Sequence, residues 1–186
     1  MLIRGEKMLI ERQWAMPNKN TFSIKPIHDL LSCEVEQNKI VVDPFSNGER
    51  EFGTLTNDLN PNVDSDYHED ALQFLKSIPT GKADIVLYDP PYSTRQVSES
   101  YHNFGFEVTQ ADTQASWRRK HLDEIARILK PNGKCICFGW NSNGVGIKRG
   151  FNLYRVLIVA HGGSHNDTLV TCEIKLNQKI IIIMLN

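Results

Sequence analysis

The sequence of 186 residues lacks several features that would assign a protein to a class at once. It has no apolar stretch long enough for a signal peptide or a membrane span; the C-terminal run, residues 179–185 (KIIIIML), is either a last edge strand or an irregular terminus. The net charge is only −1, so no general basic field is present and any nucleic-acid surface must be a local patch. The motif G-x-G-x-x-G is absent, which argues against an NAD-dependent oxidoreductase.

Cysteine is scarce, and its spacing excludes a disulfide framework. Cys33, Cys135, Cys137 and Cys172 include no C-x-x-C pair, so we expect reduced, mostly buried thiols in a cytoplasmic protein and no metal site. Hydrophobic residues make up 40% and charged residues 23%, which is ordinary for a globular chain. The length predicts a single domain over residues 1–186, with its core at about 20–177 and peripheral termini.

The residues that are present predict an α/β fold. Strands are expected at 40–45, 54–59, 83–88, 134–140, 153–160 and 168–176, and helices at 70–78 and 114–129. Alternation of strands and helices is typical of a parallel sheet. The last two β-rich runs flank HGGSHND (161–167), which is typical of a hairpin loop, so one strand should be antiparallel.

Carboxylates follow three of the predicted strands. Asp43, Asp58 and Asp89 stand at strand ends, and Asp70 begins the next predicted helix. Each one alone is typical of a turn or a helix N-cap. Parallel strands end at the same edge of a sheet, however, and acids there bind ribose and adenine in doubly wound folds. Together they indicate a nucleoside site.

The stretch IVLYDPPYST (85–94) runs from an apolar strand into two prolines. Proline has no N–H to donate and fixes φ, so Pro90 and Pro91 end the strand. A simple strand terminator is one interpretation. The other is functional, because open α/β sheets bind their ligands at the carboxyl ends of buried strands. We favour the functional interpretation of Asp89-Pro90-Pro91-Tyr92.

The ordered segments VVDPF, TNDLNP, EDALQFL, VLYDPPYS and LKPNGKCICFGWNSNG resemble the S-adenosylmethionine-dependent amino-methyltransferases of DNA, with DPPY as the most specific element. TFSIKPI (21–27) is similar to the segment that precedes the first strand in that family. The resemblance covers about residues 20–175. It implies a Rossmann-like, doubly wound, mostly parallel seven-stranded sheet with an antiparallel C-terminal strand, and S-adenosyl-L-methionine as cofactor.

The resemblance also implies roles for individual residues. The cofactor would be bound by Phe22, Lys25, Pro26, Asp43, Pro44, Phe45, Asn47, Asp58, Asp70, Ala71 and Asp89, and the target base by Asp89, Pro90, Pro91 and Tyr92. The family usually has D-P-F-x-G-x-G and a helix after its first strand, whereas DPFSNGER keeps one glycine. Asp43 and Asp58 are only fifteen positions apart. We expect either a compact loop in which Asn47 and backbone groups replace the glycines, or weak cofactor binding.

The chemistry of amine methylation explains these residue types. An exocyclic amine on a nucleobase is a poor nucleophile, because its lone pair is delocalised into the ring. The Asp89 carboxylate and the Pro90 carbonyl can accept its N–H groups, while Tyr92 offers a face for stacking. No Pro-Cys pair is present, which argues against cytosine C5 methylation. By resemblance alone, the Asp of DPPY favours adenine N6 over cytosine N4.

Basic residues supply candidate contacts to nucleic acid: Arg95, Arg118, Arg119, Lys148 and Arg149. A solvated helix or loop face is the alternative for each. The segment 93–106 is either a lid over the base or core-packing aromatics. The chain has little room for a separate recognition domain, so sequence choice would come from its loops or from a separate partner. An RNA amino-methyltransferase and a non-catalytic binding module stay open as alternatives.

Overall fold

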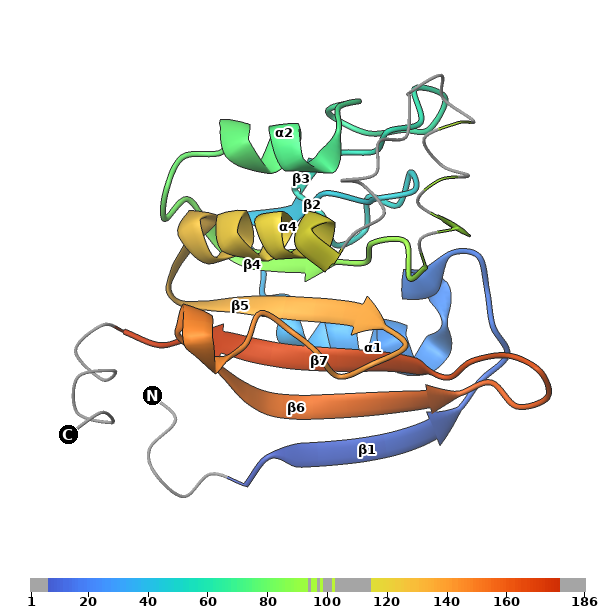
Figure 1. The fold of residues 1–186 in the computed structure, drawn as a ribbon. Helices are drawn as coiled ribbons and strands as arrows, with labels where there is room; N and C mark the ends of the chain where they lie inside the picture. The colour runs from blue at the N-terminus through green and yellow to red at the C-terminus, as the bar shows by residue number, and fades with distance from the viewer. Residues whose placement is uncertain (1–6, 94, 97, 99–101, 103–114, 178–186) are drawn as a thin grey trace.

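The computed structural model describes residues 7–93, 95, 96, 98, 102 and 115–177, which form one mixed β-sheet with helices on both faces (Figure 1). The expected edge strand at 179–185 and most of the expected lid at 93–106 lie outside these residues. The strands are β1 (Leu9–Trp14), β2 (Val41–Asp43), β3 (Leu55–Thr56), β4 (Ala83–Tyr88), β5 (Leu129–Gly139), β6 (Phe151–Ala160) and β7 (Thr168–Lys175). The helical segments are η1 (Thr21–Ser23), α1 (Lys25–Glu34), α2 (Ala71–Ser77), α4 (Ala115–Ile128) and η2 (Ile147–Arg149).

The strand order in the seven-stranded sheet is β1-β6-β7-β5-β4-β2-β3. All neighbouring strands are parallel except β7, which is antiparallel to both β5 and β6. The Rossmann-like, mostly parallel sheet with one antiparallel C-terminal strand is therefore confirmed. The carboxyl ends of the parallel strands β2, β3, β4 and β5 meet at one edge, toward which the arrows of β4 and β5 point in Figure 1.

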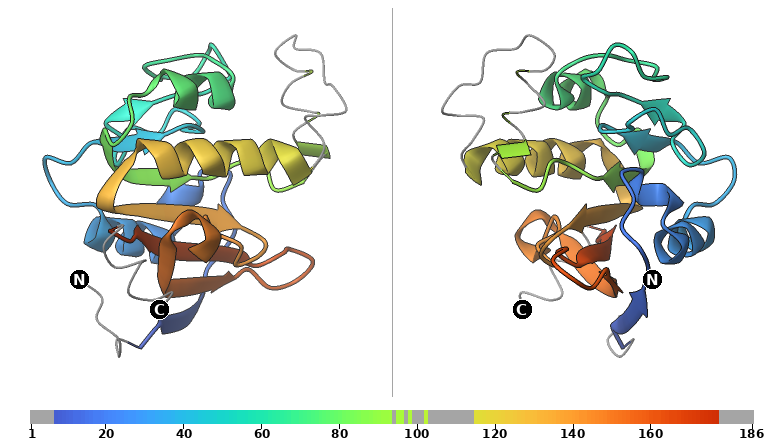
Figure 2. Two further views of the ribbon diagram at one scale, coloured as in Figure 1. Left: turned by 60° about the vertical axis from the view of Figure 1, so that its left-hand side comes forward. Right: turned by 90° about the vertical axis from the view of Figure 1, so that its right-hand side faces the viewer.

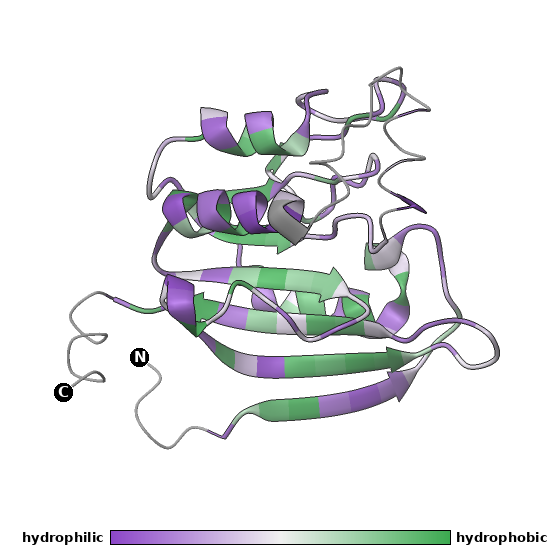
Figure 3. Ribbon diagram, viewed as in Figure 1, coloured by the Kyte–Doolittle hydropathy of each residue, from purple (hydrophilic) through white to green (hydrophobic). Residues whose placement is uncertain are grey.

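Strand β1 belongs to the sheet although it lies before residue 20, where the core of the domain was expected to begin. It pairs in parallel with β6 at the sheet edge, and its side chains are exposed on both faces apart from the half-buried Glu11. Its second half is hydrophilic (Figure 3). A strand whose side chains reach no core has no apolar periodicity, so the sequence carries little signal for it.

Alternating residues of β4 face two separate cores. Val86 and Tyr88 point toward α2 and α4, whereas Ile85 and Leu87 point toward α1. Figure 2 shows α1 on the side of the sheet opposite α4. All four side chains are at most 3% exposed, and complete burial of such a residue stabilises the fold by about 1.5–3 kcal/mol. Within the described residues, no helix is long and apolar enough to cross a membrane.

The connection from α4 to β5 differs from the expectation. The sequence predicts a gap at residues 130–133, which include Pro131 and Gly133, between the helix at 114–129 and the strand at 134–140. In the structure β5 already begins at Leu129, and its register against β4 shifts between Ala83 and Ile85. Asn132 adopts a φ of 65° in this stretch, so the turn residues form an irregularity inside the strand rather than a gap before it.

Helix α1 is attached to the sheet by a group of polar side chains around Glu34. The Glu34 carboxylate accepts hydrogen bonds from Tyr154 Oη at 2.7 Å and Lys134 Nζ at 3.1 Å, and Arg155 Nη1 lies at 3.3 Å. Burial raises the pKa of Glu34, but these donors outweigh it and the pKa is lowered. The paired carboxylate fixes the end of α1 against β5 and β6.

Candidate active site

A cavity of about 550 Å³ opens at the carboxyl edge of the sheet. Its wall comes from the segments that follow β2, β3 and β4, from the start of α2 and from α4. The predicted site residues that line it are Pro44, Phe45, Asn47, Asp58, Asp70, Ala71, Asp89, Pro90, Pro91 and Tyr92. The structure thus brings together most of the set that the sequence indicated, in a volume typical of small-molecule sites.

The loop after β2 is compact, and no helix forms between β2 and β3, whose connecting residues are all described. Asn47 and Gly48 both have positive φ, at 47° and 79°, so the chain reverses within two residues. The Asn47 N–H donates to Asp58 Oδ2 at 2.8 Å, and the Asn60 N–H donates to Asp58 Oδ1 at 2.8 Å. Backbone groups from the segments before and after β3 therefore hold Asp58 at the cavity wall.

The sequence left open whether Asp70 is a helix N-cap or part of a ligand site, and its position in the structure is compatible with both. Its Oδ1 caps α2 by accepting from the N–H groups of Leu72 at 3.0 Å and Gln73 at 3.2 Å. It also lines the cavity, beside Ala71. Asp70 is therefore both the N-cap of α2 and a residue of the cavity wall.

Trp117 and His121 of α4 lie at this side of the cavity, although neither is among the predicted site residues. Trp117 lines the cavity, and its ring centroid lies 6.2 Å from that of Phe45. His121 is fully buried beneath both rings, 4.2 Å from the Trp117 centroid, and shares a hydrogen bond of 3.1 Å with Tyr88 Oη. Burial lowers the pKa of His121 to about 4, so it is neutral at pH 7. The spacing of Trp117 and His121, one helical turn apart on the face of Leu122 and Ile125, is the signal that places them inside.

Asp43 is completely buried and does not line the cavity. Its Oδ1 accepts from the Phe45 N–H at 3.1 Å, while Oδ2 has no hydrogen-bond partner among the described residues. Burial raises the pKa of Asp43 well above its usual value, and the charges of Asp89 and Asp58 raise it further. An unpartnered buried carboxylate oxygen is costly, and a positively charged ligand group would satisfy it.

Asp89 lies directly after β4, where Tyr92 and Thr21 surround its carboxylate. The Tyr92 hydroxyl donates to Asp89 Oδ1, and the Thr21 side chain of η1 is also hydrogen-bonded to the carboxylate. Burial raises the pKa of Asp89 to about 6, although both hydroxyl groups act in the opposite direction. At neutral pH the group is mainly an anion that is short of water, which makes it a strong acceptor.

The segment 21–27 contributes less to the cavity than the resemblance implied. Thr21 lines the cavity, and Phe22 lines a smaller adjoining pocket that also includes Asn47 and Asp89. Lys25 is exposed and forms an ion pair of 2.8 Å with Asp29, while Pro26 is buried in the first turn of α1. Neither Lys25 nor Pro26 lines either pocket.

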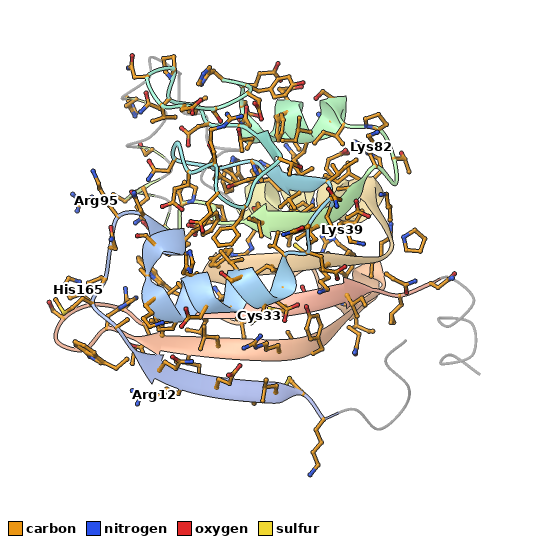
Figure 4. The ribbon with its side chains drawn as sticks, turned by 180° about the vertical axis from the view of Figure 1, so that it is seen from behind. Arg12, Cys33, Lys39, Lys82, Arg95 and His165 are labelled. Atoms are coloured by element: carbon orange, nitrogen blue, oxygen red, sulfur yellow. The ribbon has the colours of Figure 1, made fainter. Side chains whose placement is uncertain are left out.

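The five basic candidates fall into two groups. Arg118 donates to the Asn143 carbonyl at 2.6 Å, with its guanidinium 5.6 Å from the Tyr88 ring centroid, and Arg149 pairs with Asp123 at 2.7 Å. These two side chains brace the protein itself. Arg119 and Lys148 are exposed, as is Arg95, which Figure 4 shows at the same edge of the sheet as His165.

The loop 161–167 joins β6 to β7 as a hairpin, as expected, but it does not line the cavity. His161 is buried and bonds the Ala15 carbonyl at 2.8 Å and the Thr168 hydroxyl at 2.9 Å. Its role is to hold the loop. In the part of the chain that is described, no group of histidine, cysteine and acidic side chains is placed to hold a metal ion.

No protein-family model matches the chain. Over 79 residues it is 27% identical to the type II methyltransferase M.BamHI of Bacillus amyloliquefaciens, an alignment that covers 41% of this chain and 18% of that protein. The chain therefore spans less than a fifth of the curated relative that it matches.

Solved structures share the fold at low identity. TrmN from Thermus thermophilus matches with a TM-score of 0.53 and 16% identity, over 82% of this chain and 49% of that one. The 1,6-didemethyltoxoflavin-N1-methyltransferase of Burkholderia thailandensis, which contains S-adenosylhomocysteine, matches with 0.53 and 12%, over 82% and 78%. The N-methyltransferase NodS of Bradyrhizobium japonicum matches with 0.54 and 12%, over 87% and 100%. This chain has the Rossmann-like fold of methyltransferases.

Proposed function

We propose that this protein transfers a methyl group from S-adenosylmethionine to the exocyclic N6 of adenine in DNA. The observation that carries the proposal is the position of Asp89-Pro90-Pro91-Tyr92 at the carboxyl end of β4, on the wall of a cavity that Asp58 and Asp70 also line. The similarity to M.BamHI and the methyltransferase fold support it.

The cavity fits S-adenosylmethionine in the chemistry of its walls. Asp58 and Asp70 supply acceptors for ribose hydroxyls and an adenine amine, and Phe45 and Trp117 supply apolar surface for a ring. Asp43 does not line this wall, but it directly precedes the lining residue Pro44, and its buried Oδ2 has no hydrogen-bond partner among the described residues. When bound, this cofactor supplies an electrophilic methyl group on a sulfonium.

Asp89 and Pro90 prepare the target amine in this proposal. The carboxylate and the Pro90 carbonyl accept its two N–H groups, which draws the nitrogen toward tetrahedral geometry and frees its lone pair. The N–C bond forms as the S–C bond breaks, and the surplus proton leaves the nitrogen toward Asp89 or water. The Tyr92 hydroxyl donates to Oδ1 in the structure, so the amine would use one of the other acceptor positions of the carboxylate.

The proposal is tested by incubating the chain with S-adenosylmethionine carrying a labelled methyl group and with DNA or RNA of random sequence. We expect label in DNA, recovered as N6-methyladenine by mass spectrometry of the digested nucleosides. Label in RNA alone would move the substrate to RNA, and N4-methylcytosine would change the target base. Absence of label from both nucleic acids would refute methyl transfer.

Methyl transfer should also depend on pH in a way set by Asp89. Its carboxylate must be ionised to accept the amine, and burial raises its pKa to about 6. Activity is therefore expected to be full above pH 7 and to fall about tenfold per unit as the pH drops below 6. Single-turnover rates between pH 5 and 8 measure this. A rate that stays constant down to pH 5 would contradict the role.

A further inference from the structure

Trp140 is an exposed aromatic side chain beside the candidate active site. It follows β5 directly and is 42% exposed. Because Tyr88 of β4 is paired with Cys137 of β5, the chain beyond each strand places Trp140 level with the DPPY turn. Its ring centroid lies 5.6 Å from that of Tyr92, with the two rings inclined at 68°. The Tyr92 ring lines the cavity, whereas Trp140 contacts Tyr92 without lining the cavity itself.

The loop that follows Trp140 is held by buried polar groups. Glu173 of β7, only 3% exposed, accepts from the N–H groups of Val145 at 2.5 Å and Gly146 at 3.0 Å. Arg118 donates to the Asn143 carbonyl at 2.6 Å. A ring at the start of a braced loop loses little conformational freedom when a ligand stacks on it, so its contact area contributes efficiently to binding.

The exposure of Trp140 is not explained by the fold. Among the described residues, most of the large apolar side chains that are exposed belong to or adjoin β1, the edge strand, and they include Trp14 at 65% exposed. Trp140 instead follows β5, the middle strand of the sheet, and its neighbours in the sequence include the polar Asn141 and Ser142. An aromatic face that is braced, accessible and surrounded by polar groups is the type of surface on which unpaired nucleobases stack.

We propose that Trp140 stacks on the nucleobase next to the target base, in nucleic acid whose strands are locally separated. The proposal rests on the proposed function, because it takes Tyr92 as the face for the target. The neighbouring nucleotide would bind at Trp140, at the carboxyl edge of the sheet and outside the cavity. Stacking carries little information about base identity, so Trp140 would add affinity with little sequence preference.

The test measures binding of a fluorescein-labelled single-stranded DNA of twelve nucleotides by anisotropy, without any methyl transfer. Trp140→Ala should weaken binding about 5- to 150-fold, the range expected for one lost stacked base, and Trp140→Phe should retain most of it. Trp14→Ala removes an equally large exposed ring on β1 and should leave binding unchanged. Affinity for S-adenosylmethionine, measured by calorimetry, should be the same in all three variants.

Oligonucleotides with an abasic site on either side of one adenine separate stacking from a structural effect. Removing the stacked base should weaken binding to the parent protein and have no further effect on Trp140→Ala. Parent-like binding by Trp140→Ala would overturn the proposal even if methyl transfer is found. Loss of binding in Trp140→Ala by a protein that transfers no methyl group would support stacking and refute only the proposed activity. A parent protein that binds no oligonucleotide at millimolar concentration would overturn the stacking proposal.

Discussion

Replacing Asp89 with asparagine is expected to lower the rate of methyl transfer about a hundredfold or more and to leave the affinity for S-adenosylmethionine within a few-fold of the parent. The substitution keeps the size of the side chain but removes its charge. Loss of one acceptor aimed at the reacting group costs about 3 kcal/mol in the transition state. Single-turnover transfer to DNA gives the rate, and calorimetry gives the cofactor affinity.

Asp84→Asn is the matched control for this experiment. Asp84 belongs to the same strand, β4, but lies at the opposite edge of the sheet, where it pairs with Lys130 at 2.8 Å and accepts from the Ile40 N–H at 2.9 Å. Its replacement should lower stability slightly and leave the rate of transfer unchanged. If Asp89→Asn retained activity within a few-fold of the parent, Asp89 would be only a strand-end turn residue.

Gly144→Ala should lower the free energy of unfolding by about 3 kcal/mol or more. A Cβ at Gly144 would lie 2.0 Å from Glu173 Oε2 and 2.5 Å from Glu173 Cδ. The buried carboxylate would then have to leave the N–H groups of Val145 and Gly146, and each hydrogen bond to a charged group contributes about 1.5–3 kcal/mol. Urea denaturation followed by circular dichroism measures the difference.

Gly139→Ala provides the comparison, because the nearest contacts of an added Cβ there are at 4.0 Å. It should change stability by less than about 1 kcal/mol. Combining Gly144→Ala with Glu173→Ala removes the clashing carboxylate, so the double variant should be more stable than the sum of the single effects predicts. Additive effects, or a Gly144→Ala protein as stable as Gly139→Ala, would show that the loop relaxes without cost.

Elements with strong local patterns could be predicted from the sequence. The expected helices at 70–78 and 114–129 correspond to α2 and α4, and the expected strand at 83–88 corresponds to β4. The carboxyl edge of a parallel sheet then places Asp58, Asp70 and Asp89 near one another by geometry alone. Their sequence order and the apolar periodicity contain all the information this requires.

Features that depend on contacts between distant segments could not be predicted. The helical spacing of His121 indicates a buried side chain, but it does not indicate that Phe45 from the loop after β2 packs against it. Arg118 is engaged by Asn143, which lies beyond the next strand. The β1 strand exists because β6 offers a free edge. In each case the partner lies far along the chain, so local propensity gives no indication of it.

Because no helix lies between β2 and β3, the cavity disfavours nucleotides that carry phosphate groups. A helix that starts behind such a loop would direct backbone N–H groups at a ligand and favour phosphate. Here the corresponding wall presents the Asp58 carboxylate, with Asp70 and Asp89 beside it. A pyrophosphate-bearing dinucleotide would be repelled by these anions, whereas a cationic sulfonium would be attracted. The same charges would hold the demethylated, neutral by-product less tightly than the cation that entered, so electrostatics would favour turnover over product retention.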